Sequence, residues 1–93
     1  MNQAIKHIPG QNRFELELEG GLSAFILYKR NKDHLDLIHS EVPKPQRGQG
    51  IGRTLVFITL EQIEKEGLTA TALCPYIKAV VLSSEKWKNI INH

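Results

Sequence analysis

The period of the apolar residues changes at residues 47–52, and this change most constrains the fold. Before it, apolar residues follow the patterns of strands. After it, a longer segment repeats them at i, i+4 and i+7, as one face of a helix does. The segment between reads Arg-Gly-Gln-Gly-Ile-Gly. The chain is therefore predicted to be an α/β protein with a glycine-rich turn joining a strand to a helix.

Three strand-like segments precede this turn. The first alternates apolar and charged residues, the second is apolar on both faces and should be central, and the third ends at Pro43 because proline cannot donate to a strand ladder. Gly20-Gly21 and Asn31-Lys32-Asp33 are typical of hairpin turns, so the three strands are expected to be antiparallel. Their predicted ranges are Arg13–Glu19, Leu22–Lys29 and His34–Val42.

The segments after the turn indicate a crossover helix, a fourth strand and terminal helices. The crossover helix spans Gly50–Glu66 with Gly67 as its cap, and the fourth strand spans Leu68–Leu73. Pro75 suits a first helical position, which predicts a helix to about Leu82. The last ten residues carry Trp87, Ile90 and Ile91 at helical spacing, as a stripe covering the core or an interface.

A helix between two strands usually makes them parallel, with a right-handed crossover. The third and fourth strands would then end at the same edge of the sheet, where open α/β sheets bind ligands. The glycine turn follows one of these strands and Cys74-Pro75-Tyr76 follows the other. These two segments are therefore expected to meet.

Length and composition restrict the functions that this chain can have. The 93 residues predict one domain, 1–93, without room for a separate substrate domain. Twelve Lys and Arg against ten Asp and Glu give a net charge of +2, which makes a dedicated nucleic-acid binder unexpected. The single cysteine excludes an internal disulfide, and the N-terminal stretch Met1–Lys6 lacks a signal-peptide core. With no apolar run of membrane-spanning length, a cytoplasmic protein with no membrane partner is expected.

The glycine turn has the features of a diphosphate site. Glycine allows positive φ and close approach of the backbone, and the first N–H groups of a helix lack intrahelical partners and can bind an anion. Arg53 and Thr54 add side-chain donors in the first helical turn. A dinucleotide fingerprint would need glycine in place of Arg53, and a P-loop would need Gly-Lys-Ser or Gly-Lys-Thr. The alternative is a flexible loop kept polar by Lys44, Gln46, Arg47 and Gln49.

Together with its setting, this turn resembles the Arg/Gln-x-x-Gly-x-Gly/Ala signature of the GNAT superfamily of acetyl-CoA-dependent N-acetyltransferases. The segments 37–43, 47–52 and 73–77 are similar to the short, single-domain YjdJ-type branch, so the resemblance covers nearly the whole chain. Branch members usually have His-Thr where this chain has His39-Ser40. The resemblance implies a minimal GNAT-like fold that lacks the helices shaping the acceptor pocket in larger relatives.

The resemblance also implies where acetyl-CoA would bind. The CoA pyrophosphate would lie on the turn, at Arg47, Gly48, Gln49, Gly50, Ile51, Gly52, Arg53 and Thr54. Backbone N–H groups near Ser40 and Val42 would bind the thioester carbonyl and stabilise the oxyanion. Acetyl-CoA is thus the expected cosubstrate, and an unidentified amine, on a small molecule or a protein, is the expected acceptor.

Four side chains are candidates for the chemistry. The imidazole of His39 exchanges protons near neutral pH and suits a general base, with Glu41 as a second candidate that is otherwise a solvated surface residue. Pro75 places Cys74 at a helix N-cap, where the helix dipole favours a thiolate, so Cys74 could accept the acetyl group or protonate the departing CoA. Tyr76 competes for the second role by its position in the family pattern. For His39, Cys74 and Tyr76 the alternative is a packing role.

The function predicted from the sequence is acetyl transfer to an amine, by direct attack with His39 as base or through acetyl-Cys74. A different class of function, an acyl-CoA-binding sensor or interaction module without turnover, is the alternative. Nucleic-acid binding through Lys44, Arg47 and Arg53 is a weaker third hypothesis, since the overall charge is nearly balanced. His7, His34 and His93 show no ligand spacing with one another or with Cys74, so no metal site is predicted.

Overall fold

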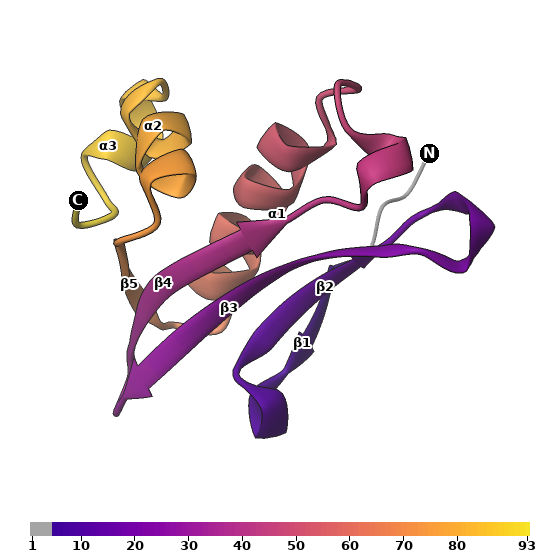
Figure 1. Ribbon diagram of the computed structural model, residues 1–93. Helices are drawn as coiled ribbons and strands as arrows, with labels where there is room; N and C mark the ends of the chain where they lie inside the picture. Colours follow the sequence, from indigo (N-terminus) through magenta and orange to yellow (C-terminus); the bar gives the residue numbers. More distant parts are fainter. Residues whose placement is uncertain (1–4) are drawn as a thin grey trace.

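The computed structural model describes residues 5–93, which form a five-stranded sheet in the order β1-β2-β3-β4-β5 (Figure 1). Neighbouring strands are antiparallel from β1 to β4, and β4 and β5 are parallel. Met1–Ala4, part of the stretch that lacks a signal-peptide core, lie outside the described residues. The strands are β1 Ile5–Ile8, β2 Arg13–Glu17, β3 Ser23–Asn31, β4 His34–Glu41 and β5 Thr69–Ala72.

Three α-helices complete the described part of the fold: α1 Ile51–Lys65, α2 Pro75–Leu82 and α3 Glu85–Lys88. Short 3₁₀ turns lie at Pro9–Gln11, Glu19–Gly21 and Lys44–Gln46. The predicted α/β fold with a β4–α1–β5 crossover is confirmed. The strand β1 was not predicted, because only four residues carry its pattern; its His7 pairs with Phe14 of β2, and the two rings stack 4.1 Å apart. Among residues 5–93, no helix is long and apolar enough to cross a membrane.

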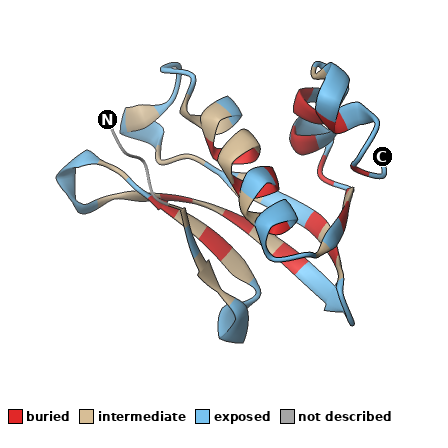
Figure 2. Cartoon of the chain, turned by 180° about the vertical axis from the view of Figure 1, so that it is seen from behind, coloured by how far each residue is buried: buried red, intermediate tan, exposed pale blue. Residues whose placement is uncertain are grey.

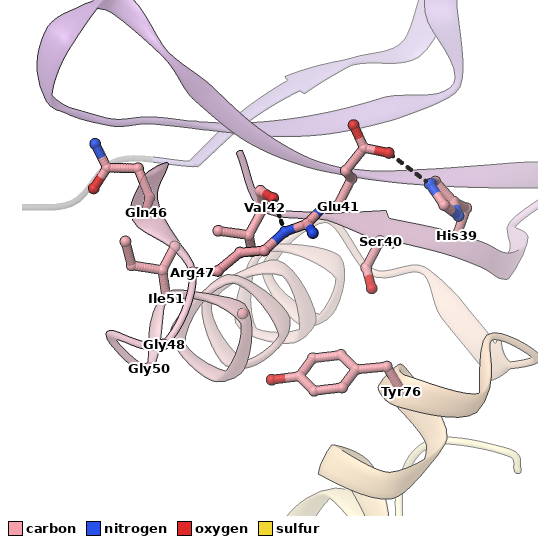
Figure 3. Close-up of a pocket in the computed structure, with 11 residues that line it drawn as sticks. His39, Ser40, Glu41, Val42, Gln46, Arg47, Gly48, Gly50, Ile51 and Tyr76 are labelled. Atoms are coloured by element: carbon pink, nitrogen blue, oxygen red, sulfur yellow. Dashed lines mark hydrogen bonds and ion pairs between the residues drawn. The ribbon is translucent and has the colours of Figure 1, made fainter. Parts of the chain in front are cut away.

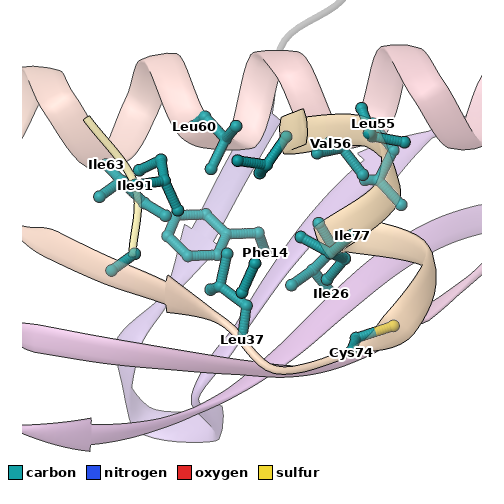
Figure 4. Close-up of a cluster of buried hydrophobic side chains, with 14 of the residues drawn as sticks. Phe14, Ile26, Leu37, Leu55, Val56, Leu60, Ile63, Cys74, Ile77 and Ile91 are labelled. Atoms are coloured by element: carbon teal, nitrogen blue, oxygen red, sulfur yellow. The ribbon is translucent and has the colours of Figure 1, made fainter. Parts of the chain in front are cut away.

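The core lies between the sheet and α1, which covers one face (Figure 2). The helix buries Leu55, Val56, Leu60 and Ile63, most of the two apolar ridges read from the sequence. They pack in one cluster with the buried residues of the strands and with Ile77 of α2 (Figure 4). No α-helix of residues 5–93 covers the opposite face of the sheet, which faces the viewer in Figure 1.

The C-terminal segment is less helical than its apolar spacing suggests. Trp87 and Ile91 are buried as the predicted stripe requires, but Ile90 is half exposed, and α3 is a single turn. Beyond it the chain runs along β5, where the Ala72 N–H donates to the Asn92 carbonyl at 2.8 Å and the Asn92 N–H donates to the Ala70 carbonyl at 3.0 Å. The edge strand β5 thus supplies the backbone of Asn92 with hydrogen bonds in place of those that a helix would provide.

Strand β4 extends beyond its parallel partner. The pairing with β5 ends at Leu37 and Ala72, whereas β4 continues to Glu41 and remains paired with β3. The register against β3 shifts at Leu27 and Tyr28, which marks a β-bulge around Ile38. The last residues of β4 therefore have a strand neighbour on only one side, next to the point where α1 begins.

Candidate functional site

One cavity of ≈ 540 Å³ lies at this edge of the sheet, between the end of β4, the glycine turn, the start of α1 and α2 (Figure 3). The predicted meeting of the turn with the segment after β5 is therefore observed through Tyr76. The lining residues are His39, Ser40, Glu41, Val42, Gln46, Arg47, Gly48, Gly50, Ile51, Gly52 and Tyr76. Of these, Gln46 was not predicted as a site residue. The only sequence signal for it was its position directly before the glycine motif.

The glycine turn leaves the N-terminus of α1 open. Gly48 and Gly50 have φ of 83° and 75°, and a Cβ added at either would meet nothing within 4 Å. Gly50 is the N-cap; no side chain caps the helix, and its first turn contains no acidic residue. The first N–H of α1 that donates to a carbonyl of the helix is that of Thr54, which bonds to the Gly50 carbonyl at 3.2 Å. The N–H groups of residues 51–53 are therefore available to an anion.

Arg47 joins the turn to the end of β4. Its Nε donates to the Val42 carbonyl at 3.0 Å, which holds the guanidinium beside the cavity. Three predicted binding residues, Gln49, Arg53 and Thr54, do not line the cavity. The Arg53 guanidinium instead lies 5.0 Å from the centre of the Phe57 ring, along the outside of α1.

The end of β4 presents two different faces. Ser40 pairs with the buried Ile26, so its side chain points to the helix-covered side, toward Tyr76 in Figure 3. His39 and Glu41 point to the open face, where Nε2 of His39 lies 3.3 Å from a carboxylate oxygen of Glu41. Both side chains are half exposed. The cavity is thus lined from both sides of the strand.

Cys74 lies behind the cavity wall. It is the N-cap of α2, as predicted from Pro75, but it is only 8% exposed and belongs to the apolar core. Its Sγ is 3.8 Å from Ser40 Oγ. Cys74 is thus not among the residues that line the cavity, but its thiol contacts Ser40, which is.

Tyr76 is the side chain of α2 that enters the cavity, and it is 46% exposed. Its hydroxyl packs on Gly52, where an added Cβ would come within 2.8 Å of the hydroxyl oxygen. Gly52 does not have positive φ, unlike the other two glycines of the turn. The third glycine of the motif is therefore explained here by the close approach of a tyrosine 24 positions along the chain, which the sequence spacing did not reveal.

The fold and this site define an α/β protein that presents an uncapped helix N-terminus beside a strand end that is paired on one side only. The family model of the GCN5-related N-acetyl-transferases matches residues 13–90. The chain belongs to this family, and its class of activity is acetyl transfer.

Known proteins from several organisms are similar to this chain. It is 34% identical over 79 residues to Protein NATD1 of Mus musculus and of Homo sapiens, covering 83% of this chain and 72% and 70% of theirs. The NMR solution structure of a GCN5-like protein from Staphylococcus aureus superimposes with a TM-score of 0.67 at 24% identity, covering 97% of this chain and 88% of that one. That match supports the minimal GNAT fold.

Proposed function

We propose that this chain transfers the acetyl group of acetyl-CoA to a primary amine, with the CoA bound in the cavity of Figure 3. The observation that carries the proposal is the convergence of three features on one cavity: the uncapped start of α1, the end of β4 beyond its pairing with β5, and the Tyr76 side chain. Each offers a different part of what acetyl transfer from a thioester needs.

The start of α1 fits the diphosphate of CoA. The N–H groups of residues 51–53 lack helical acceptors, and no carboxylate stands in the first helical turn to repel an anion. The guanidinium of Arg47, fixed by Val42, adds a positive charge at the same edge. The cavity extends from there along β4 to His39 and Ser40, where the thioester end of the molecule would lie.

The end of β4 and Tyr76 fit the chemistry. Acetyl-CoA supplies an acetyl group activated as a thioester. Backbone N–H groups near residues 40–42 would polarise the thioester carbonyl, and His39, supported by Glu41, would take a proton from the attacking amine. As the C–N bond forms and the C–S bond breaks, the sulfur receives the electron pair and a proton from the Tyr76 hydroxyl.

A covalent route through acetyl-Cys74 is the second candidate. It is supported by the 3.8 Å contact of the thiol with Ser40, a residue of the cavity wall. The burial of Cys74 disfavours it, because a thioester must approach a nucleophile directly. Tyr76, which is exposed to the cavity, is better placed than Cys74 to protonate the CoA sulfur.

The test compares three histidine and tyrosine variants in steady-state assays with acetyl-CoA and a panel of primary amines. His39→Gln and Tyr76→Phe should each lower kcat by about a hundredfold or more, the usual size of general acid–base effects, while CoA affinity is retained. His34→Gln is the matched control, because His34 lies on the same face of the same strand, bonded to Thr69 and Thr71 away from the cavity.

Two further outcomes decide between the alternatives. Wild-type protein that binds CoA tightly but acetylates none of the amines would replace the enzyme by a CoA-binding sensor or interaction module. Rapid-quench mass spectrometry after mixing with acetyl-CoA should show no acetylated protein if attack is direct. An adduct on Cys74 that forms and decays at the rate of turnover would establish the covalent route instead.

A further inference from the structure

The open face of the sheet carries an apolar surface directly beside His39. The β-bulge places two consecutive residues of β4, Ile38 and His39, in exposed positions. Ile38 is 38% exposed, and Leu73, which follows the last paired residues of β5, is 55% exposed. On the neighbouring strand Phe25 and Leu27 are half-buried and pair with Glu41 and His39. We call these four apolar residues the acceptor face.

The aromatic ring of Phe25 connects this surface to the candidate base. Its centroid lies 6.1 Å from that of the His39 ring, and the Arg13 guanidinium lies 4.3 Å from it. Arg13 is itself paired with Glu15 at 2.9 Å. A ligand seated on the acceptor face would therefore touch His39 without passing any helix.

Charge on this face favours a cationic partner near His39. Glu15, Glu17 and Glu41 all stand on the open side at the His39 end. Of the two cations of this region, Arg13 is paired with Glu15 and Lys6 stands opposite Glu15, so neither is paired with Glu17 or Glu41. Lys29 stands at the other end, opposite Asp36. The surplus of carboxylate attracts an ammonium group to the place where a proton must be removed before attack.

We infer that the acceptor is a small primary amine carrying an apolar body of aromatic size, which lies on the acceptor face with its amino group toward His39 and Glu41. This inference rests on the proposed function and adds the class of acceptor. Ile38 and Leu73 favour an apolar body, because a ligand that covers them removes apolar surface from water, and the excess of Glu side chains favours an ammonium group.

The test uses 2-phenylethylamine as probe, with ethanolamine as a polar amine and taurine as an anionic one. The acetylation of 2-phenylethylamine should exceed that of both others by at least about tenfold in kcat/KM, as expected for burial of one apolar group. Equal or better use of ethanolamine or taurine would overturn the inference while leaving the acetyltransferase in place.

Two serine variants locate the effect. Leu73→Ser and Ile38→Ser should each lower kcat/KM for 2-phenylethylamine about fivefold to tenfold, with little change for ethanolamine and in CoA affinity. Leu82→Ser is the matched control, since Leu82 is 46% exposed on α2 and lies outside both the cavity and the acceptor face. Equal losses in all three variants would contradict the assignment.

A binding measurement separates this inference from the proposed function. In the CoA complex, 2-phenylethylamine should shift the amide NMR signals of Phe25, Ile38 and Leu73 and leave those of α2 beyond Tyr76 unchanged. Such shifts without any acetylation would support the face and refute the enzyme. No shifts at these residues, or a dimer in solution that covers them, would refute the acceptor face whatever the activity.

Discussion

The two ends of α1 are built in opposite ways. At its C-terminus the helix is closed by Gly67, in positive φ, and by a bond from the Leu68 N–H to the Ile63 carbonyl at 3.1 Å. At its N-terminus the cap is Gly50, which has no side chain to offer the free N–H groups. One end satisfies its backbone from within the chain, and the other leaves its first N–H groups without acceptors in the helix.

The side chains beside the two ends of α1 differ in the same way. Beside the C-terminus, Glu66 accepts from Gln62 at 2.7 Å and from His7 Nδ1 at 2.7 Å, and the Tyr28 hydroxyl donates to the other nitrogen of His7 at 2.6 Å. His7 is 8% exposed, whereas His39 near the N-terminus is 50% exposed with one partner at 3.3 Å. Similar residue types thus serve stability where they are enclosed and remain free to react where they are not.

The sharpest test of this contrast replaces two glycines of the same backbone conformation with valine, one in each variant. Gly50→Val should weaken CoA binding about a hundredfold, the equivalent of one or two charge-assisted hydrogen bonds to phosphate. Gly20→Val is the control, because Gly20 has φ of 76° against 75° for Gly50 and also meets nothing within 4 Å. Calorimetric titration with CoA measures the first effect.

Both valine variants should lose a similar free energy of unfolding, about 1–2 kcal/mol, since each forces a β-branched residue into the left-handed region. Unchanged CoA affinity in Gly50→Val, or an equal loss in Gly20→Val, would show that the N-terminus of α1 is not the diphosphate site.

A smaller effect is expected from Gly52→Ala. The added methyl group would meet the Tyr76 hydroxyl at 2.8 Å and displace it, so kcat should fall about tenfold while CoA affinity changes less. Combining the change with Tyr76→Phe separates the cause: the double variant should be no slower than Tyr76→Phe alone. Additive losses would mean that Gly52 acts through the backbone instead.

At the closed end, Glu66→Gln should lower the free energy of unfolding by about 1 kcal/mol, because it replaces a charge-assisted pair with His7 by a neutral contact. Chemical denaturation measures this loss. CoA affinity and kcat should remain those of the wild type. A marked loss of either would contradict the assignment of stability to the C-terminal end of α1 and of CoA binding to its N-terminal end.

The smallest effect concerns acid stability. Burial alone would raise the pKa of Glu66, but hydrogen bonds from Gln62 and His7 outweigh it and lower the pKa below its ordinary value of 4.5. A lowered pKa contributes stability that is present above pH 4.5 and is lost as the pH falls through the folded-state pKa. The unfolding free energy should therefore decline more steeply below pH 4.5 in the wild type than in Glu66→Gln. Parallel curves would remove Glu66 as the cause.

Much of the fold was predictable because local signals agreed. The helical period of 50–66, the cap at Gly67 and the start of α2 at Pro75 are all effects of neighbouring residues, and each was confirmed. The strand predicted over 13–19 was confirmed as far as Glu17, where the chain turns toward Gly20 and Gly21. The strand β1 and the course of residues 89–92 were not predicted, since both depend on hydrogen bonds to strand edges far away in the sequence.

The candidate site likewise combines features that the sequence predicted with features that it did not. The spacing of its glycines and the presence of His39, Cys74 and Tyr76 in the right segments are properties of the sequence. That Cys74 is buried behind Ser40, that Arg53 turns toward Phe57 and that His39 shares a face with Phe25 follow from packing and register.

By itself, then, the sequence determined the order of elements from β2 to α2, the glycine turn and the family, because period, spacing and turn chemistry act over a few residues. Only the tertiary structure decided which side of β4 each side chain faces and why Gly52 has no side chain. Those properties depend on one bulge in β4 and on the approach of α2 to α1, contacts that no local pattern encodes.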